Sequence, residues 1–106
     1  MNDKIMDLHD VFIELSEASK CAITDEDAVK LMHKYDIIFA GEKHNEINSL
    51  ELVHTLNDYF HIHIDNDELT ELIPSVCDAM KLKYQGMKRL GDEQSKVPYC
   101  YKITLF

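Results

Sequence analysis

The chain has 106 residues, of which 45% are hydrophobic and 29% charged, and it contains only three glycines and two prolines. This length fits one domain, and the apolar content is enough for a core, which excludes an intrinsically disordered chain. The formal net charge of −9 disfavours long-range attraction to nucleic acid or anionic lipid, and the absence of a long apolar run or a signal peptide favours a cytoplasmic protein that binds no membrane.

The first two helices are predicted over residues 3–20 and 24–35. The apolar stripe of the first, with spacings of three or four residues, consists of Ile5, Leu8, Phe12 and Leu15. The acidic residues on its other faces are Asp7, Asp10, Glu14 and Glu17. At the second helix, Thr24 is placed to accept a hydrogen bond from the N–H of Asp27, which is typical of a helix cap.

The centre of the chain combines short apolar stretches with a third helix. Residues 37–40 form an apolar run that suits a brief strand or a buried linker, and the polar residues 42–48 are predicted to form a loop. Asn48 and Glu51 have the spacing of a capping box, in which each side chain binds the other residue's backbone N–H. A helix over 49–60 follows from that pattern.

A fourth helix is predicted over 66–84, again after a capping pair. Asp65 is placed as the cap and Glu68 as its partner three residues later. Pro74 falls inside the helix, and a proline within an uninterrupted helix would reduce its stability by about 3 kcal/mol. We therefore expect a kink there, or a helix that restarts with Pro74 in its first turn. Gly86 provides the C-terminal stop.

A β-hairpin is predicted over 87–106, with strands at 87–90 and 97–106 joined by a polar turn. Alternate residues of a strand point to opposite faces. One face of the second strand is predicted to hold Tyr99, Tyr101, Ile103 and Leu105. The other is predicted to hold Cys100, Lys102, Thr104 and Phe106.

These elements predict a mainly helical α+β fold, with four helices and a C-terminal β-hairpin in a single domain over residues 1–106. The order of helix, helix, short strand, helix, helix and hairpin resembles that of winged-helix domains over residues 24–106. The resemblance lies in element order, without a shared sequence motif. It implies that the helix at 65–84 would enter a DNA major groove while the hairpin touches phosphate.

The distribution of charge bears on that implication. Residues 1–80 have a net charge of −13, whereas residues 81–106 have +4. The side chains that fit phosphate contacts are Lys88, Arg89, Lys96 and Lys102. The fourth helix offers no arginine or lysine to a base edge before Lys81, although groove-reading helices depend on such side chains. We expect the basic residues to balance an acidic body, with nucleic-acid binding as the alternative.

Two histidines are the candidates for metal binding. His61 and His63 would share one face of an extended segment over 61–64. A transition metal usually takes three or four such ligands, and the sequence nominates no obvious third. In the other interpretation, the two imidazoles form the polar face of a half-buried stretch whose Ile62 and Ile64 point inward. We expect this second arrangement and no bound metal.

Motifs for catalysis are absent from the sequence, which has no G-x-S-x-G, no H-E-x-x-H and no glycine-rich phosphate loop. Cys21, Cys77 and Cys100 are odd in number and form no C-x-x-C pair, so we expect neither a disulfide nor a cysteine-based zinc site. Cys77 lies beside an apolar stripe and is expected to be a buried, inert thiol. The sequence therefore favours a non-enzymatic protein without a cofactor.

The acidic helical body favours a regulatory protein that docks on a basic surface of a protein partner. Such a partner could be a nucleic-acid-binding protein that is inhibited when its DNA site is occupied; small acidic proteins of phages and mobile elements offer an analogy. The candidate contacts are Asp67, Glu68, Glu71, Asp78, Tyr99 and Tyr101. The tyrosines could instead cover the core, and an unpaired edge of their strand would offer a docking site. A homodimer is compatible with either function.

Overall fold

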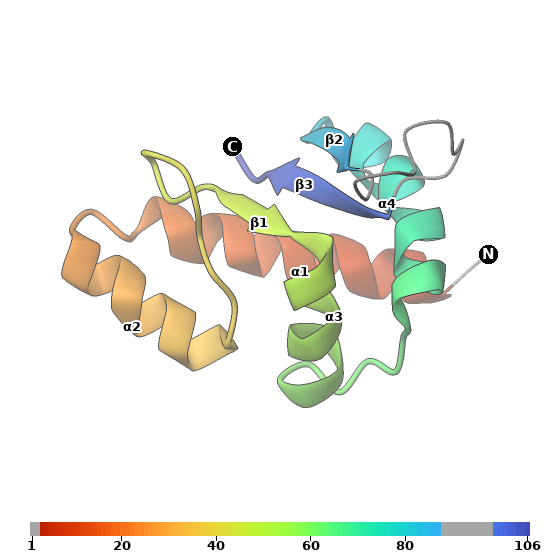
Figure 1. Cartoon of the computed structure of the whole chain (residues 1–106), viewed down its shortest axis with the longest axis horizontal. Coiled ribbons are helices and arrows are strands. Elements are labelled where there is room, and N and C mark those ends of the chain that lie inside the picture. The colour runs from red at the N-terminus through yellow and green to blue at the C-terminus, as the bar shows by residue number, and fades with distance from the viewer. Residues whose placement is uncertain (1–2, 88–98) are drawn as a thin grey trace.

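The computed structural model describes residues 3–87 and 99–106, and within them four helices surround a small sheet (Figure 1). The helices are α1 (Asp3–Lys20), α2 (Asp25–Tyr35), α3 (Ser49–Asp58) and α4 (Asn66–Met80). The strands are β1 (Glu46–Asn48), β2 (Lys83–Met87) and β3 (Cys100–Thr104). The mainly helical α+β fold class with four helices and a C-terminal β-hairpin is thus confirmed. None of the helices described is long and apolar enough to cross a bilayer.

Three of the helices begin directly after the residues that were predicted to cap them. The hydroxyl of Thr24 accepts a hydrogen bond from the N–H of Asp27 at 3.1 Å, and the carboxylate of Asp65 accepts one from the N–H of Glu68 at 2.8 Å. Asn48 likewise caps α3, but its side-chain oxygen accepts from the N–H of Leu50 at 2.8 Å rather than from that of Glu51. Both halves of the predicted capping box are therefore wrong, because the carboxylate of Glu51 accepts from the backbone N–H of Ile38 at 2.8 Å.

The sheet has the strand order β1-β3-β2, and both pairings are antiparallel. Of the two alternatives for residues 37–40, the structure has the linker, in which Ile37 and Phe39 are buried and Ala40 makes an isolated bridge to Glu46. Gly41 has a φ of 85° at the turn inside that bridge. The loop predicted over 42–48 was wrong in its last three residues, since β1 gains its backbone partners from β3, near the far end of the chain.

Helix ends differ from the sequence expectation. α3 ends at Asp58 rather than at residue 60, because the chain turns at His61, whose φ is 58°. α4 ends at Met80 rather than at residue 84, because Lys81 adopts the left-handed conformation with φ 60°. Leu82 then donates its N–H to the carbonyl of Cys77 at 2.9 Å, which closes the helix.

Residues that were expected to end α4 belong to the sheet instead. Gly86 is not a helix stop but lies within β2, opposite Tyr101. The first hairpin strand therefore begins at residue 83 rather than 87 and is described as far as Met87, while residues 88–90 and the predicted turn lie outside the described residues. α4 continues through Pro74 without the restart that we considered.

The core lies between the helices and one face of the sheet, and α2 and α4 contact α1 near its opposite ends (Figure 1). Its largest fully buried side chains include Leu8, Phe12, Leu15, Tyr35, Phe39, Leu52, Leu56, Leu69, Ile73 and Ile103. Tyr101, Ile103 and Leu105 are buried on one face of β3, as predicted. Cys100 is buried too, so the other face is also covered at that end of the strand.

Candidate protein-binding surface

One side of α1 carries a row of carboxylates. An α-helix turns by about 100° per residue, so four acidic residues fall within an arc of about 80°, away from the buried stripe. These residues are Asp7, Asp10, Glu14 and Glu17, and all four are exposed. In the part of the chain that the structure describes, none of them forms an ion pair with a lysine or arginine. The row is therefore an accessible concentration of negative charge.

A shallow groove of about 240 Å³ runs beside this row. Its lining combines three carboxylate residues and three apolar residues: Asp7, Asp10, Glu14, Val11, Phe60 and Ile62. We call it the α1 groove. Its far wall belongs to the α3–α4 link (residues 59–65), so two segments that are distant in sequence create it. The groove therefore brings apolar side chains and carboxylates together in one lining.

Aromatic packing orients Phe60 in the wall of the groove. The rings of Phe60 and Tyr35 are nearly parallel, at an angle of 14° with centroids 6.1 Å apart. Tyr59 meets the Phe60 ring edge-on at 4.9 Å. Contacts of this kind contribute about 0.5–1.5 kcal/mol beyond the burial of area. They hold the Phe60 ring in one orientation.

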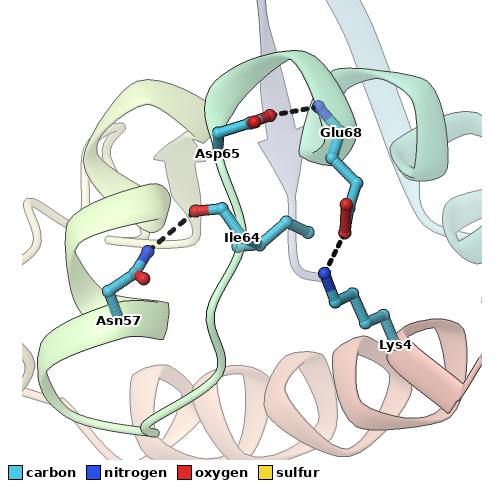
Figure 2. A network of polar contacts seen from close by, with 5 residues as sticks. All are labelled: Lys4, Asn57, Ile64, Asp65 and Glu68. Carbon is cyan, nitrogen blue, oxygen red and sulfur yellow. Dashed lines mark hydrogen bonds and ion pairs between the residues drawn. The ribbon is translucent and has the colours of Figure 1, made fainter.

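Polar contacts hold the rest of the link, as Figure 2 shows. The side-chain amide of Asn57 donates to the carbonyl of Ile64 at 2.8 Å, which ties the link to α3. At the other end, Asp65 caps α4, and Glu68 forms an ion pair with Lys4 of α1. The link is therefore anchored to α3 and α4, and the ion pair between Lys4 and Glu68 holds α4 to α1.

One carboxylate of the groove lies near a buried hydroxyl. Tyr35 is only 2% exposed, and burial raises the pKa of its hydroxyl; the neighbouring Glu14 side chain raises it further. Glu14 itself is exposed and lines the groove, so its carboxylate is accessible to a ligand.

The structure brings together three of the acidic candidates on α4. Asp67, Glu71 and Asp78 are exposed and lie along one side of the helix. Asp78 also accepts a hydrogen bond from the hydroxyl of Tyr84 at 3.0 Å. Glu68 points elsewhere, toward Lys4 of α1. The α4 row is a second acidic surface.

The two candidate tyrosines are separated. Tyr101 is buried and packs edge-on against Tyr84 with ring centroids 5.6 Å apart, so it covers the core. Tyr99 is exposed, and its carbonyl accepts a hydrogen bond from Asn66 at 3.1 Å. The docking edge considered for their strand was wrong, since β3 is the central strand and is paired on both sides.

Of the four basic candidates, one can be described. Lys102 lies 3.9 Å from the carboxylate of Glu46 and balances that charge. Lys88, Arg89 and Lys96 lie outside the described residues. Nucleic-acid contact through this group therefore stays a prediction.

The two candidate histidines are both exposed, and the residues between and after them alternate as expected. Ile62 is half-buried and Ile64 is buried, which confirms that His61 and His63 form the polar face of this stretch. Within residues 3–87 and 99–106, no group of three or more histidine, cysteine or acidic residues is arranged to hold a metal ion.

A larger hollow of about 500 Å³ lies between the end of α2 and α3. Its lining residues are Val29, Met32, His33, Asp36, Ile37, Ile38, Glu51 and His54. Glu51 is already engaged by the N–H of Ile38. The remaining lining combines four apolar residues with two imidazoles and one carboxylate, so its charge is mixed and favours no single charged partner.

The α1 carboxylates were not singled out from the sequence, although their spacing of three and four residues was visible there. The α1 groove was not visible, because Phe60 and Ile62 reach it only through the fold. No family model matches this chain, and no curated protein or solved structure shows significant similarity to it. Its surface chemistry is therefore the basis for a functional assignment.

Proposed function

We propose that this protein is a non-enzymatic regulator that docks through its acidic helical surface on a basic surface of another protein. The observation that carries the proposal is the row of exposed α1 carboxylates, without lysine or arginine partners among the described residues, beside an apolar groove. Complementary charge speeds encounter and selects the partner, while apolar area buried at the centre of an interface supplies affinity.

The partner that fits best is a nucleic-acid-binding protein. Proteins that bind DNA gather lysine and arginine on one surface in order to neutralise phosphates. An acidic surface that covers those residues excludes the nucleic acid, so binding of this protein would inhibit such a partner. The second acidic row on α4, with Asp67 and Glu71, extends the same charge to another side of the molecule.

Affinity capture from an extract of the source cells tests this function. The immobilised protein is expected to retain basic proteins at about 50 mM NaCl and to release them at about 500 mM, because salt screens exposed charges. A captured protein should lose its ability to retard DNA when the acidic protein is added. Capture that is indifferent to salt, or a complex that still binds DNA fully, contradicts the proposal.

A pair of charge variants controls for unspecific attraction. Replacement of the four α1 carboxylates by their amides (Asp7→Asn, Asp10→Asn, Glu14→Gln and Glu17→Gln) should abolish both capture and inhibition. A control with the same number of charges removed (Asp25→Asn, Asp36→Asn, Glu26→Gln and Glu42→Gln), all at exposed residues away from the groove and the α4 row, should retain both. Equal losses in the two variants would mean that net charge alone decides binding.

A further inference from the structure

We infer that the α1 groove is the anchor site for one arginine side chain of the basic partner. The inference rests on the proposed function and adds to it the chemical group that the surface recognises. At about 240 Å³, the groove is smaller than the roughly 300–1,000 Å³ of pockets that enclose small-molecule ligands. It is open along one side of α1, and its size suits a single side chain that projects from a protein surface.

The lining matches the two parts of an arginine. The methylene stem of arginine lies readily along apolar surface while its charged head stays at a polar rim. Ile62 and Phe60, which are half-buried, offer that apolar surface, and the exposed carboxylates of Asp7 and Asp10 line the same groove. The stem therefore loses contact with water while the guanidinium keeps anionic partners.

Two features favour arginine over lysine. A guanidinium is planar and stacks on aromatic rings, and Phe60 is held in one orientation by Tyr35 and Tyr59. The guanidinium also has five N–H donors in a fixed arrangement that suits carboxylates, and the groove lining contains the carboxylates of Asp7, Asp10 and Glu14. A lysine ammonium would gain the charge interaction without the stacking.

Titration of the isotope-labelled protein with hexa-arginine and hexalysine peptides, followed by NMR, tests this inference. Hexa-arginine is expected to bind at least about five-fold more tightly than hexalysine. Its largest chemical-shift changes should fall on the backbone amides of Val11, Glu14, Phe60 and Ile62. Changes spread evenly over all acidic surfaces, or equal affinity for the two peptides, would overturn the inference.

Variants separate the groove from general electrostatics. Asp10→Asn with Glu14→Gln should weaken hexa-arginine binding at least about five-fold more than Asp36→Asn with Glu42→Gln, which removes the same charge elsewhere. Phe60→Leu keeps the groove lining apolar but removes the aromatic ring, so it should abolish the preference for arginine over lysine. Circular dichroism checks that each variant is folded. A preference that survives Phe60→Leu would contradict the stacking.

The outcomes distinguish this inference from the proposed function. If basic proteins are captured in a salt-sensitive manner but hexa-arginine does not select the groove, the docking function stands and the anchor is wrong. If hexa-arginine occupies the groove while no captured protein loses its DNA binding, the anchor stands and the inhibitory function is wrong.

Discussion

The buried hydroxyl of Thr55 in α3 donates a hydrogen bond to the backbone carbonyl of Tyr35 at 2.8 Å. Tyr35 is the last residue of α2, and Asp36 after it adopts a left-handed conformation that ends the helix. One side-chain hydroxyl therefore satisfies a carbonyl at a helix end and joins two helices. It also supports the aromatic ring that packs against Phe60 in the wall of the α1 groove.

Replacement of Thr55 by valine should lower the free energy of unfolding by about 1–3 kcal/mol, since it leaves the Tyr35 carbonyl buried without this donor. Urea denaturation measures the loss. Thr70→Val is the matched control: the Thr70 hydroxyl is buried and has no hydrogen-bond partner among the described residues, so its removal should be neutral or stabilising. Similar losses in both variants would contradict the role given to Thr55.

Removal of the α4 cap should also be measurable. Asp65→Ala deletes the acceptor for the N–H of Glu68 and is expected to cost about 1 kcal/mol. Asp65→Asn, which keeps a side-chain oxygen, should recover most of that loss. Glu71→Ala, on the exposed side of the same helix, should stay within about 0.5 kcal/mol of the parent protein in thermal and urea denaturation.

The free energy of unfolding should decline at alkaline pH, because the buried thiol of Cys77 and the buried hydroxyl of Tyr35 then lose their protons. Burial raises the pKa of the Cys77 thiol from 9.0 to about 12, so the folded protein holds this proton more tightly than the unfolded chain. The resulting stabilisation is complete below about pH 9 and is lost as the pH rises toward about 12. Tyr35 contributes in the same direction from its ordinary pKa of 10.0 upward.

Denaturation at about pH 8 to 11 measures this decline. In Cys77→Ala the free energy of unfolding should fall less steeply with pH than in the parent protein, whatever the absolute cost of the lost packing. An unchanged slope would show that the thiol does not contribute.

One of the three cysteines should react quickly with a thiol reagent, and the other two should react slowly. Cys21 is exposed, whereas Cys77 and Cys100 are buried. A chromogenic disulfide reagent should therefore modify one thiol of the native protein quickly and all three in denaturant. Cys21→Ser should abolish the fast phase. A second fast thiol would contradict the burial of the other two.

A gel-retardation assay with duplex DNA tests the alternative that the protein binds nucleic acid. We expect no retardation of duplex DNA by this protein at about 50 mM NaCl, because its net negative charge opposes binding. Retardation that disappears when Lys88, Arg89 and Lys96 are replaced by glutamate would instead favour the winged-helix interpretation.

Much of the helical part of the fold was predictable, because its signals are local. Thr24 and Asp65 cap the helices that follow them, and each cap involves residues only three positions apart. The alternation of buried residues in β3 was equally local. Such patterns do not depend on the rest of the chain.

The sheet and the site were less predictable, because both depend on distant residues. β1 is a strand only because Ile47 pairs with Ile103, and a three-residue segment has little intrinsic signal. The end of α4 was misplaced because Lys81, rather than a glycine, adopts the left-handed conformation. The α1 groove forms only because the fold places Phe60 and Ile62 beside α1, from which they are distant in sequence. The periodicity of α1 does not indicate this contact.

The central position of β3 has a consequence for the order of assembly. Both flanking strands precede β3 in the chain, and Glu46 pairs with Thr104 across more than half the chain's length. As the protein is synthesised, its helices can form and pack early, whereas β1 and β2 have no ladder partner until the last strand arrives. Insertion of that strand closes the sheet in a single late step.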